Sequence, residues 1–191
     1  PLVDWSFVER IKQKYGEDSD EYRIRVLGQF PKGDLIDEKG YVPLLFENDL
    51  KYANNEQFTG RRYLGVDPSG EGSNDTIWAL RDNYRAKILG KERISSPKSI
   101  AQKTLTLMYH FGVKPRDVII DNFGEGANIA QEMALASDKD DEPIRITAVN
   151  VGDKSENEDF LNERARCYFN IKQWLRSGGE LYPDESWKEL L

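Results

Sequence analysis

The chain has 191 residues, enough for one ordinary domain with an additional arm. Hydrophobic residues make up 38% of it, and no apolar run approaches the roughly 20 residues of a membrane-spanning helix, so we expect a soluble, intracellular protein. The formal net charge of −7 argues against a protein that coats nucleic acid with a basic surface, but an enzyme that acts on nucleic acid through bound cations is compatible with it.

The chain has one cysteine, Cys167, and one histidine, His110. These counts exclude an internal disulfide, a cysteine-based zinc site and a multi-histidine metal site. Both residues fall in segments with helical patterns, where we expect structural roles. Polar chemistry in this chain must therefore rest mainly on carboxylates.

The N-terminal part is expected to be an arm or connector. Apolar residues recur at helical spacing in residues 3–15, and Gly16 follows as a helix stop. Residues 22–26 alternate apolar and basic side chains, which predicts a half-buried strand or an extended arm. The sequence then stays polar and irregular, so we assign residues 1–60 to a linker or arm and residues 61–191 to the main domain.

The main domain has the pattern of a mixed α/β fold. Ser96 and Pro97 predict a helix start, and Asp82-Asn83 predicts a hairpin turn. The element order is β-β-β-α-β-α-β-α, that of the ribonuclease H-like fold, with a mixed central sheet and helices on both faces. The expected strands are residues 61–67, 76–82, 84–94, 117–121 and 144–151, and the expected helices are residues 97–111, 126–136 and 161–175.

Two of the apolar runs end in an aspartate, Asp67 in YLGVD and Asp121 in VIID. If the two strands are neighbours, these carboxylates converge at the strand ends, where α/β sheets gather their sites. Adjacent carboxylates repel unless a cation lies between them, and hard cations such as Mg²⁺ or Mn²⁺ prefer such oxygens. Two ions roughly 3.5–4 Å apart would suit phosphodiester hydrolysis. The plain alternative for each aspartate is a turn or helix cap.

Further acids are weaker candidates. Asp75, at the entry to the second strand, and Glu125, at a helix start, could support the metal ligands or serve the turn and the helix dipole. We expect Glu163 to be a solvated acid with Arg166 as its partner. Glycines after the two strands would let a large ligand approach the backbone, or simply allow tight turns: Gly70, Gly72, Gly124 and Gly126.

Three segments in order resemble the C-terminal nuclease domain of tailed-bacteriophage terminase large subunits: GVDPSGEGSNDTIWAL, DVIIDNFGEGANIAQEM and FLNERARCYFNIKQWLRSGGEL. The upstream YRIRVLGQFP resembles the stretch that joins the packaging ATPase domain to that nuclease domain. The resemblance spans residues 5–181. It implies an RNase H-like endonuclease that uses two Mg²⁺ or Mn²⁺ ions to cut concatemeric viral DNA during packaging. It makes Asp67 and Asp121 the first two catalytic acids and metal ligands.

The resemblance also implies partners and a place of action. The substrate would be double-stranded DNA, and the partners would be the ATPase domain of the same full-length protein, the portal and the small terminase subunit. No membrane is involved, and the protein would act in the cytoplasm of the infected bacterial host, transiently at the procapsid portal vertex.

The family supplies a third catalytic acid from a later motif. Asp184 and Glu185 in YPDES match the region before that motif. We therefore expect the third ligand beyond Leu191, with the nuclease domain truncated at its C-terminus. No Gly-x-x-x-x-Gly-Lys-Ser/Thr sequence is present, so the ATPase motor is not expected in these residues.

Three alternatives stay open at this point. A resolvase- or integrase-type nuclease of the same fold would share the acids. An actin-like or sugar-kinase ATPase would use DPSGEG as a phosphate loop, although such proteins usually have larger, duplicated chains. A DNA-binding clamp would bind DNA but have no catalytic activity. Metal-dependent cleavage and nucleotide binding separate these classes.

Overall fold

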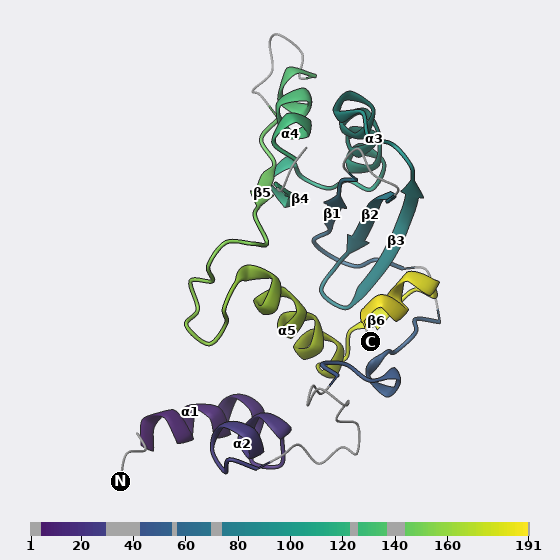
Figure 1. Cartoon of the computed structure of the whole chain (residues 1–191). Helices are drawn as coiled ribbons and strands as arrows, with labels where there is room; N and C mark the ends of the chain where they lie inside the picture. Colours follow the sequence, from purple (N-terminus) through teal and green to yellow (C-terminus); the bar gives the residue numbers. More distant parts are fainter. Residues whose placement is uncertain are drawn as a thin grey trace. The chain divides into compact units, whose positions relative to one another are not determined.

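The computed structural model describes residues 5–29, 43–54, 57–69, 74–122, 126–136 and 144–190. Contacts within the chain divide it into two compact units, Pro1–Pro43 and Leu44–Leu191, whose elements are labelled in Figure 1. No helix among the described residues is long and apolar enough to cross a membrane.

The smaller unit contains two helices, α1 (Trp5–Tyr15) and α2 (Asp20–Arg25). Helix α1 confirms the predicted first helix: Val8 and Ile11 are buried, and Gly16 follows it with a φ of 82°.

The prediction of a strand over residues 22–26 is wrong, because α2 is helical there. The Ser19 hydroxyl accepts a hydrogen bond from the Tyr22 backbone N–H at 3.1 Å and caps the helix. Acids occupy the first turn and arginines the last, which suits the helix dipole. This cap and charge order outweighed a short alternation that fits a strand equally well.

The larger unit is built on one six-stranded sheet in the order β5-β4-β1-β2-β3-β6. Strands β1, β2 and β3 pair antiparallel, whereas β4 pairs parallel with β1, β5 with β4 and β6 with β3. This mixed sheet, flanked by helices, confirms the predicted RNase H-like fold class (Figure 1). The strands are β1 (Tyr63–Asp67), β2 (Thr76–Arg81), β3 (Arg85–Glu92), β4 (Val118–Asp121), β5 (Thr147–Val149) and β6 (Glu180–Leu181).

Helices α3 (Pro97–His110) and α4 (Gly126–Leu135) lie side by side over the sheet (Figure 1). Ser96 accepts from the Ser99 N–H and caps α3, as predicted. A short 3₁₀ turn, η2 (Pro115–Asp117), leads into β4. One core joins the helices to alternate residues of the central strands, and its fully buried members include Leu64, Trp78, Leu80, Ile100, Ile120, Ile129 and Met133.

A second core cluster lies near β3 and β6. Helix α5 (Glu163–Arg176) and two 3₁₀ turns, η1 (Glu47–Asp49) and η3 (Glu185–Leu190), surround it. Its buried residues are Leu45, Leu50, Ala86, Leu175 and Leu181.

The second cluster bears on the expected division of the chain. Leu45 and Leu50 belong to its core, so residues 44–54 and 57–60 are grouped with the sheet. An arm-like role for the residues before Leu44 stays a prediction. The apolar face predicted for α5 is buried only toward its end, because Leu175 is fully buried whereas Leu161, just before the helix, is 86% exposed.

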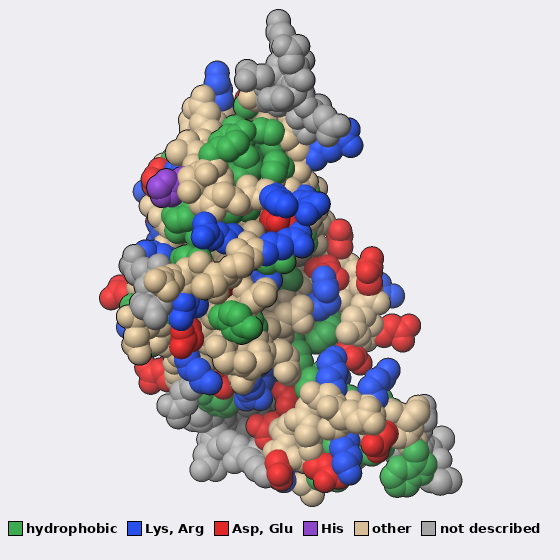
Figure 2. Space-filling view, turned by 180° about the vertical axis from the view of Figure 1, so that it is seen from behind, with side chains coloured by type: hydrophobic (Ala, Val, Ile, Leu, Met, Phe, Trp, Pro, Cys, Tyr) green, Lys and Arg blue, Asp and Glu red, His purple; other side chains and the backbone are tan. Residues whose placement is uncertain are grey.

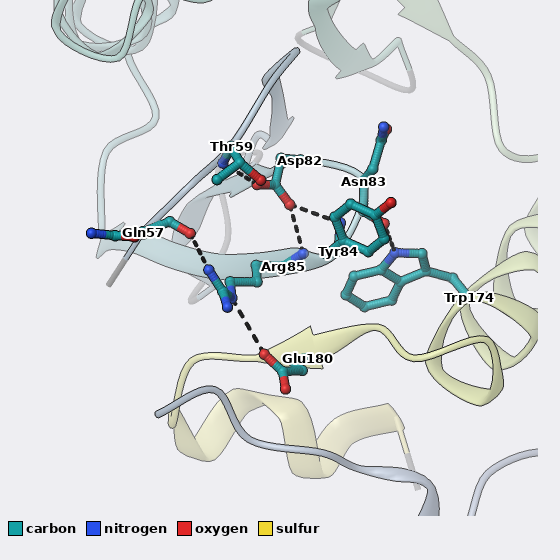
Figure 3. Close-up of polar contacts among 8 residues, drawn as sticks. All are labelled: Gln57, Thr59, Asp82, Asn83, Tyr84, Arg85, Trp174 and Glu180. Carbon is teal, nitrogen blue, oxygen red and sulfur yellow. Dashed lines mark hydrogen bonds and ion pairs between the residues drawn. The ribbon is translucent and has the colours of Figure 1, made fainter. Parts of the chain in front are cut away.

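The β2–β3 hairpin turn forms where Asp82-Asn83 predicted it, and Figure 3 shows its contacts. The Asp82 carboxylate is fully buried and accepts the N–H groups of Tyr84 at 2.8 Å and Arg85 at 2.7 Å. Its second oxygen accepts the Thr59 N–H at 2.6 Å. Trp174 of α5 donates its indole N–H to the Asn83 carbonyl at 2.7 Å, which ties α5 to the turn.

Candidate active site

The parallel pairing of β1 and β4 places Asp67 and Asp121 at neighbouring strand ends. Leu64 pairs with Val118 and Val66 pairs with Ile120. The next position in each strand is an aspartate, and both strands end there. The expectation that these strands are neighbours is confirmed. Asp67 is exposed and Asp121 is half-buried, so a solute can reach the edge they share.

The other two candidates differ in what the structure shows. Asp75 directly precedes β2, which runs antiparallel to β1, so it lies at the same edge of the sheet as Asp67 and is exposed. Glu125 lies outside the described residues. No cluster of three Asp, Glu, His or Cys side chains able to hold a metal occurs within the described ranges.

The donor set at this edge fits a hard divalent cation. Asp67 and Asp121 supply carboxylate oxygens from adjacent strands, and such oxygens are the ligands that Mg²⁺ and Mn²⁺ prefer. A two-residue set leaves positions for water, substrate phosphate or a further ligand. The identity of a third protein ligand stays a prediction.

A buried hydroxyl pair fixes the turn that follows Asp67. The Ser69 N–H donates to Thr76 Oγ1 at 3.0 Å, and the two hydroxyl oxygens lie 2.9 Å apart. Both hydroxyls are within hydrogen-bond distance of the Ile94 carbonyl, at 2.9 and 2.8 Å. We infer that Ser69 and Thr76 position the end of β1. Neither residue was predicted as part of the site, and the only signal in the sequence was two small polar residues flanking the glycine-rich loop.

Gly126 brings the start of α4 against the end of β4. A Cβ at this position would lie 2.0 Å from the Asp121 carbonyl oxygen and 2.9 Å from the Asp121 carbonyl carbon. Both contacts are with backbone, which cannot rotate away as a side chain could. The sequence left open a ligand approach or a tight turn at this glycine, and the structure shows that it admits the chain's own backbone beside Asp121.

Replacing Gly126 by alanine is therefore expected to displace either α4 or the end of β4. Overpacking of this kind typically costs about 1–3 kcal/mol. Urea unfolding of Gly126→Ala measures the loss. The matched control is Gly65→Ala, whose added Cβ would lie 3.8 Å from the nearest atom, the Ala79 carbonyl oxygen. Equal stability of both variants would contradict the close approach at Gly126.

The prediction that Glu163 is a solvated acid is wrong. Glu163 is buried, with 9% exposure, and accepts a hydrogen bond from Arg166 Nε at 2.7 Å. The partner itself was predicted correctly. The Arg166 guanidinium holds the pKa of Glu163 below its usual value, so this acid is kept charged as part of the α5 start.

Asp184 lies at the same end of the sheet as Asp67 but has a different environment. It forms an ion pair with Lys91 at 2.9 Å and accepts the Ser186 N–H at 2.9 Å. Lys91 pairs across the sheet with Ile77, which in turn pairs with Asp67. The lysine lowers the pKa of Asp184. The ion pair already neutralises the negative charge of the Asp184 carboxylate.

Asp117 occupies the opposite end of β4 from Asp121. Its carboxylate is 2% exposed, and both oxygens accept hydrogen bonds from the Arg61 guanidinium, with Arg61 Nε at 3.0 Å. This contact lowers the pKa of Asp117. A lowered pKa contributes stability above the unfolded-state value of about 3.9, and that stability is lost as the pH falls through the folded-state value.

Arg61→Ala should therefore destabilise the protein more at pH 7 than at pH 3. At neutral pH the variant keeps a buried carboxylate without its guanidinium, whereas protonation at low pH removes that penalty. Urea unfolding at both pH values measures the two differences. The double variant Arg61→Ala/Asp117→Asn should lose the pH dependence, and a constant difference for Arg61→Ala alone would contradict this account.

Comparisons with family models and with curated proteins give no match. Comparison with solved structures shows that the chain shares the fold of phage terminase nuclease domains. It is similar to a point mutant of gp2c, from the large terminase subunit of bacteriophage Sf6, with calcium, at a TM-score of 0.53 and 16% identity, over 70% of this chain and 69% of that one. The same point mutant of the nuclease domain of gp2 of bacterial virus Sf6, with manganese and beta-thujaplicinol, gives a TM-score of 0.51 at 15% identity, over 69% and 68% of the two chains.

The large terminase nuclease from thermophilic phage G20c is also similar, at a TM-score of 0.51 and 15% identity over 73% of each chain. The solved structures named here come from phage large terminase subunits, the family that the sequence resembles. At these identities the likeness establishes the fold.

Proposed function

We propose that this chain is the endonuclease domain of a viral DNA-packaging terminase, which cuts concatemeric double-stranded DNA by metal-dependent phosphodiester hydrolysis. The observation that carries the proposal is the β1–β4 register, which brings Asp67 and Asp121 to adjacent strand ends. The fold shared with phage terminase nuclease domains supports the same reaction.

In this proposal Asp67 and Asp121 would hold Mg²⁺ or Mn²⁺, with two ions in the complete site. Bound ions would activate a water and stabilise the leaving oxygen of the phosphodiester. Three other residues would position these two ligands. Ser69 and Thr76 fix the turn after Asp67, and Gly126 lets α4 approach Asp121. Asp75 and Glu125 would support the site by accepting hydrogen bonds from metal-bound water.

The proposed function also implies binding partners and a cellular location. Double-stranded DNA is the substrate, and the ATPase domain of the full-length protein, the portal and the small terminase subunit are the partners. The site of action is the cytoplasm of the infected host, transiently at the portal vertex. The third ligand is proposed to lie beyond Leu191.

Cleavage of supercoiled plasmid tests the proposed function. Linear or nicked product should form with Mg²⁺ or Mn²⁺ and not with EDTA. We expect little cleavage by residues 1–191 and strong cleavage by a longer chain that includes the third acid. If residues 1–191 are active and Asp184→Ala removes that activity, Asp184 is the third ligand instead.

Measurements of nucleotide binding, substrate preference and duplex binding separate the alternatives. ATP binding or hydrolysis by residues 1–191 would contradict the nuclease proposal and favour the actin-like ATPase. Strong preference for branched over linear duplexes would favour a resolvase. Inactivity of the longer chain with every divalent metal, despite duplex binding, would favour a DNA-binding clamp.

A further inference from the structure

A basic pocket lies at the opposite ends of β1 and β4 from Asp67 and Asp121. Its volume is about 310 Å³. Residues on the lead-in to β1 and on the lead-in to β4 line it together: Arg61, Arg62, Lys114, Arg116 and Asp117. Nothing in the proposed cleavage reaction uses this pocket.

The pocket has an uncompensated positive charge. Its one acid, Asp117, is buried and held by Arg61, so this pair is neutral. Arg62, Lys114 and Arg116 have no ion pair with a carboxylate among the described residues. A chain of net charge −7 that gathers three such cations in one pocket presents a local site for an anion.

Arg62 is held in place within this pocket. It donates from one terminal nitrogen to the Phe111 carbonyl at 2.7 Å, at the end of α3. Its Nε is buried and has no hydrogen-bond partner in the described part of the chain. The Phe111 contact fixes the guanidinium before any ligand arrives, and such preorganisation lowers the cost of binding.

Positive charge continues along this end of the sheet. Arg81 on β2 pairs across the sheet with Tyr63 on β1, and its guanidinium lies 4.9 Å from the Tyr63 ring centroid. Arg61 approaches the same ring at 5.2 Å. Figure 2 shows Lys and Arg side chains gathered across the upper middle of the face seen from behind. The cations form an extended surface and not a single point charge.

We propose that this pocket binds the phosphate backbone of duplex DNA. Arginine forks match phosphate oxygens, and lysine adds a point charge. Arg62 directly precedes β1 and Asp67 ends it five residues later, a length of roughly 16–17 Å at about 3.3 Å per residue. The same length of B-DNA contains about five base pairs, at 3.4 Å each. A duplex that follows β1 can therefore contact the pocket about five base pairs from the bond at the carboxylates.

The choice of DNA rests on the proposed function, but its test does not depend on cleavage. The affinity for a 30-base-pair duplex is measured by fluorescence anisotropy in EDTA at several salt concentrations. The logarithmic salt slope should fall by about 2 for Lys114→Gln/Arg116→Gln, because each lost phosphate contact removes about 0.9 from it. Adding Arg62→Gln should bring the loss to about 3. Arg61 stays unchanged, since its loss would strand Asp117.

The matched control is Lys51→Gln/Lys98→Gln, which removes two exposed cations outside the pocket. This control should keep the original slope. The proposal is overturned if both double variants lose the same slope, if neither does, or if the unaltered chain binds no duplex at low salt. The proposal is also overturned if the pocket binds polyglutamate or inorganic phosphate as tightly as it binds duplex DNA.

The two proposals fail separately. Duplex binding through the pocket without metal-dependent cleavage by the longer chain would contradict the proposed nuclease function but not the proposed DNA-binding pocket. If the pocket variants still cleave DNA and keep the duplex affinity and salt slope of the unaltered chain, only the proposed DNA-binding pocket is contradicted.

Discussion

Asp67→Asn and Asp121→Asn should each reduce metal-dependent plasmid cleavage by more than about 100-fold. Loss of residues that merely orient a metal ligand typically costs 10–100-fold, and loss of a ligand itself should cost more. Asparagine keeps the shape of the side chain but removes the charge that attracts the cation. The rate is measured with the longer chain that carries the third acid, under Mg²⁺ and Mn²⁺ in turn.

Thermal unfolding gives a second readout that does not require activity. Mn²⁺ should raise the Tm of the unaltered chain, because a ligand that binds only the folded state stabilises it. The same variants should show no such rise.

Asp184→Asn is the matched control for both measurements. Asp184 is at the same end of the sheet, but Lys91 already holds its carboxylate. We expect cleavage and the Mn²⁺-induced rise in Tm to survive this change. If Asp184→Asn abolishes both whereas Asp121→Asn does not, the metal lies at β3 and β6 and our assignment of the site is wrong.

The central sheet could be predicted because its strands carry strong local signals. The apolar runs that became β1 and β4 and the Asp82-Asn83 turn before β3 each have a physical cause within a few residues. The same signals gave the neighbouring positions of Asp67 and Asp121, since this strand order in an α/β sheet puts β4 beside β1.

Features that depend on distant contacts could not be predicted in this way. Strand β6 is two residues long and exists because Glu180 and Leu181 pair with Arg85 and Ala86 of β3. Nothing local in Glu180-Leu181 indicates that pairing.

The environment of a charged residue is equally hard to predict from local sequence. Glu163 has an acidic neighbourhood in sequence, with Asp159 before it, yet Arg166 and the preceding loop bury it. For the active site, position along a strand was predictable, whereas the hydroxyl pair of Ser69 and Thr76 required tertiary structure.

Asp82→Ala should destabilise the larger unit by roughly 3 kcal/mol, about 1 kcal/mol for each hydrogen bond lost at an unsatisfied donor. The carboxylate accepts three backbone N–H groups, from Thr59, Tyr84 and Arg85, and is itself fully buried (Figure 3). Alanine leaves all three donors without this acceptor. Urea unfolding followed by tryptophan fluorescence measures the loss, because Trp174 contacts the same turn.

Asp82→Asn separates the hydrogen bonds from the charge. The amide oxygen can still accept from Tyr84 and Arg85, while its NH₂ group would face the Thr59 N–H, so only one bond should be lost. We therefore expect this variant to lose about a third of what alanine loses. If asparagine costs as much as alanine, the negative charge and not the number of acceptors holds the turn. If neither change lowers stability, the turn does not anchor residues 57–59 or α5 to the sheet.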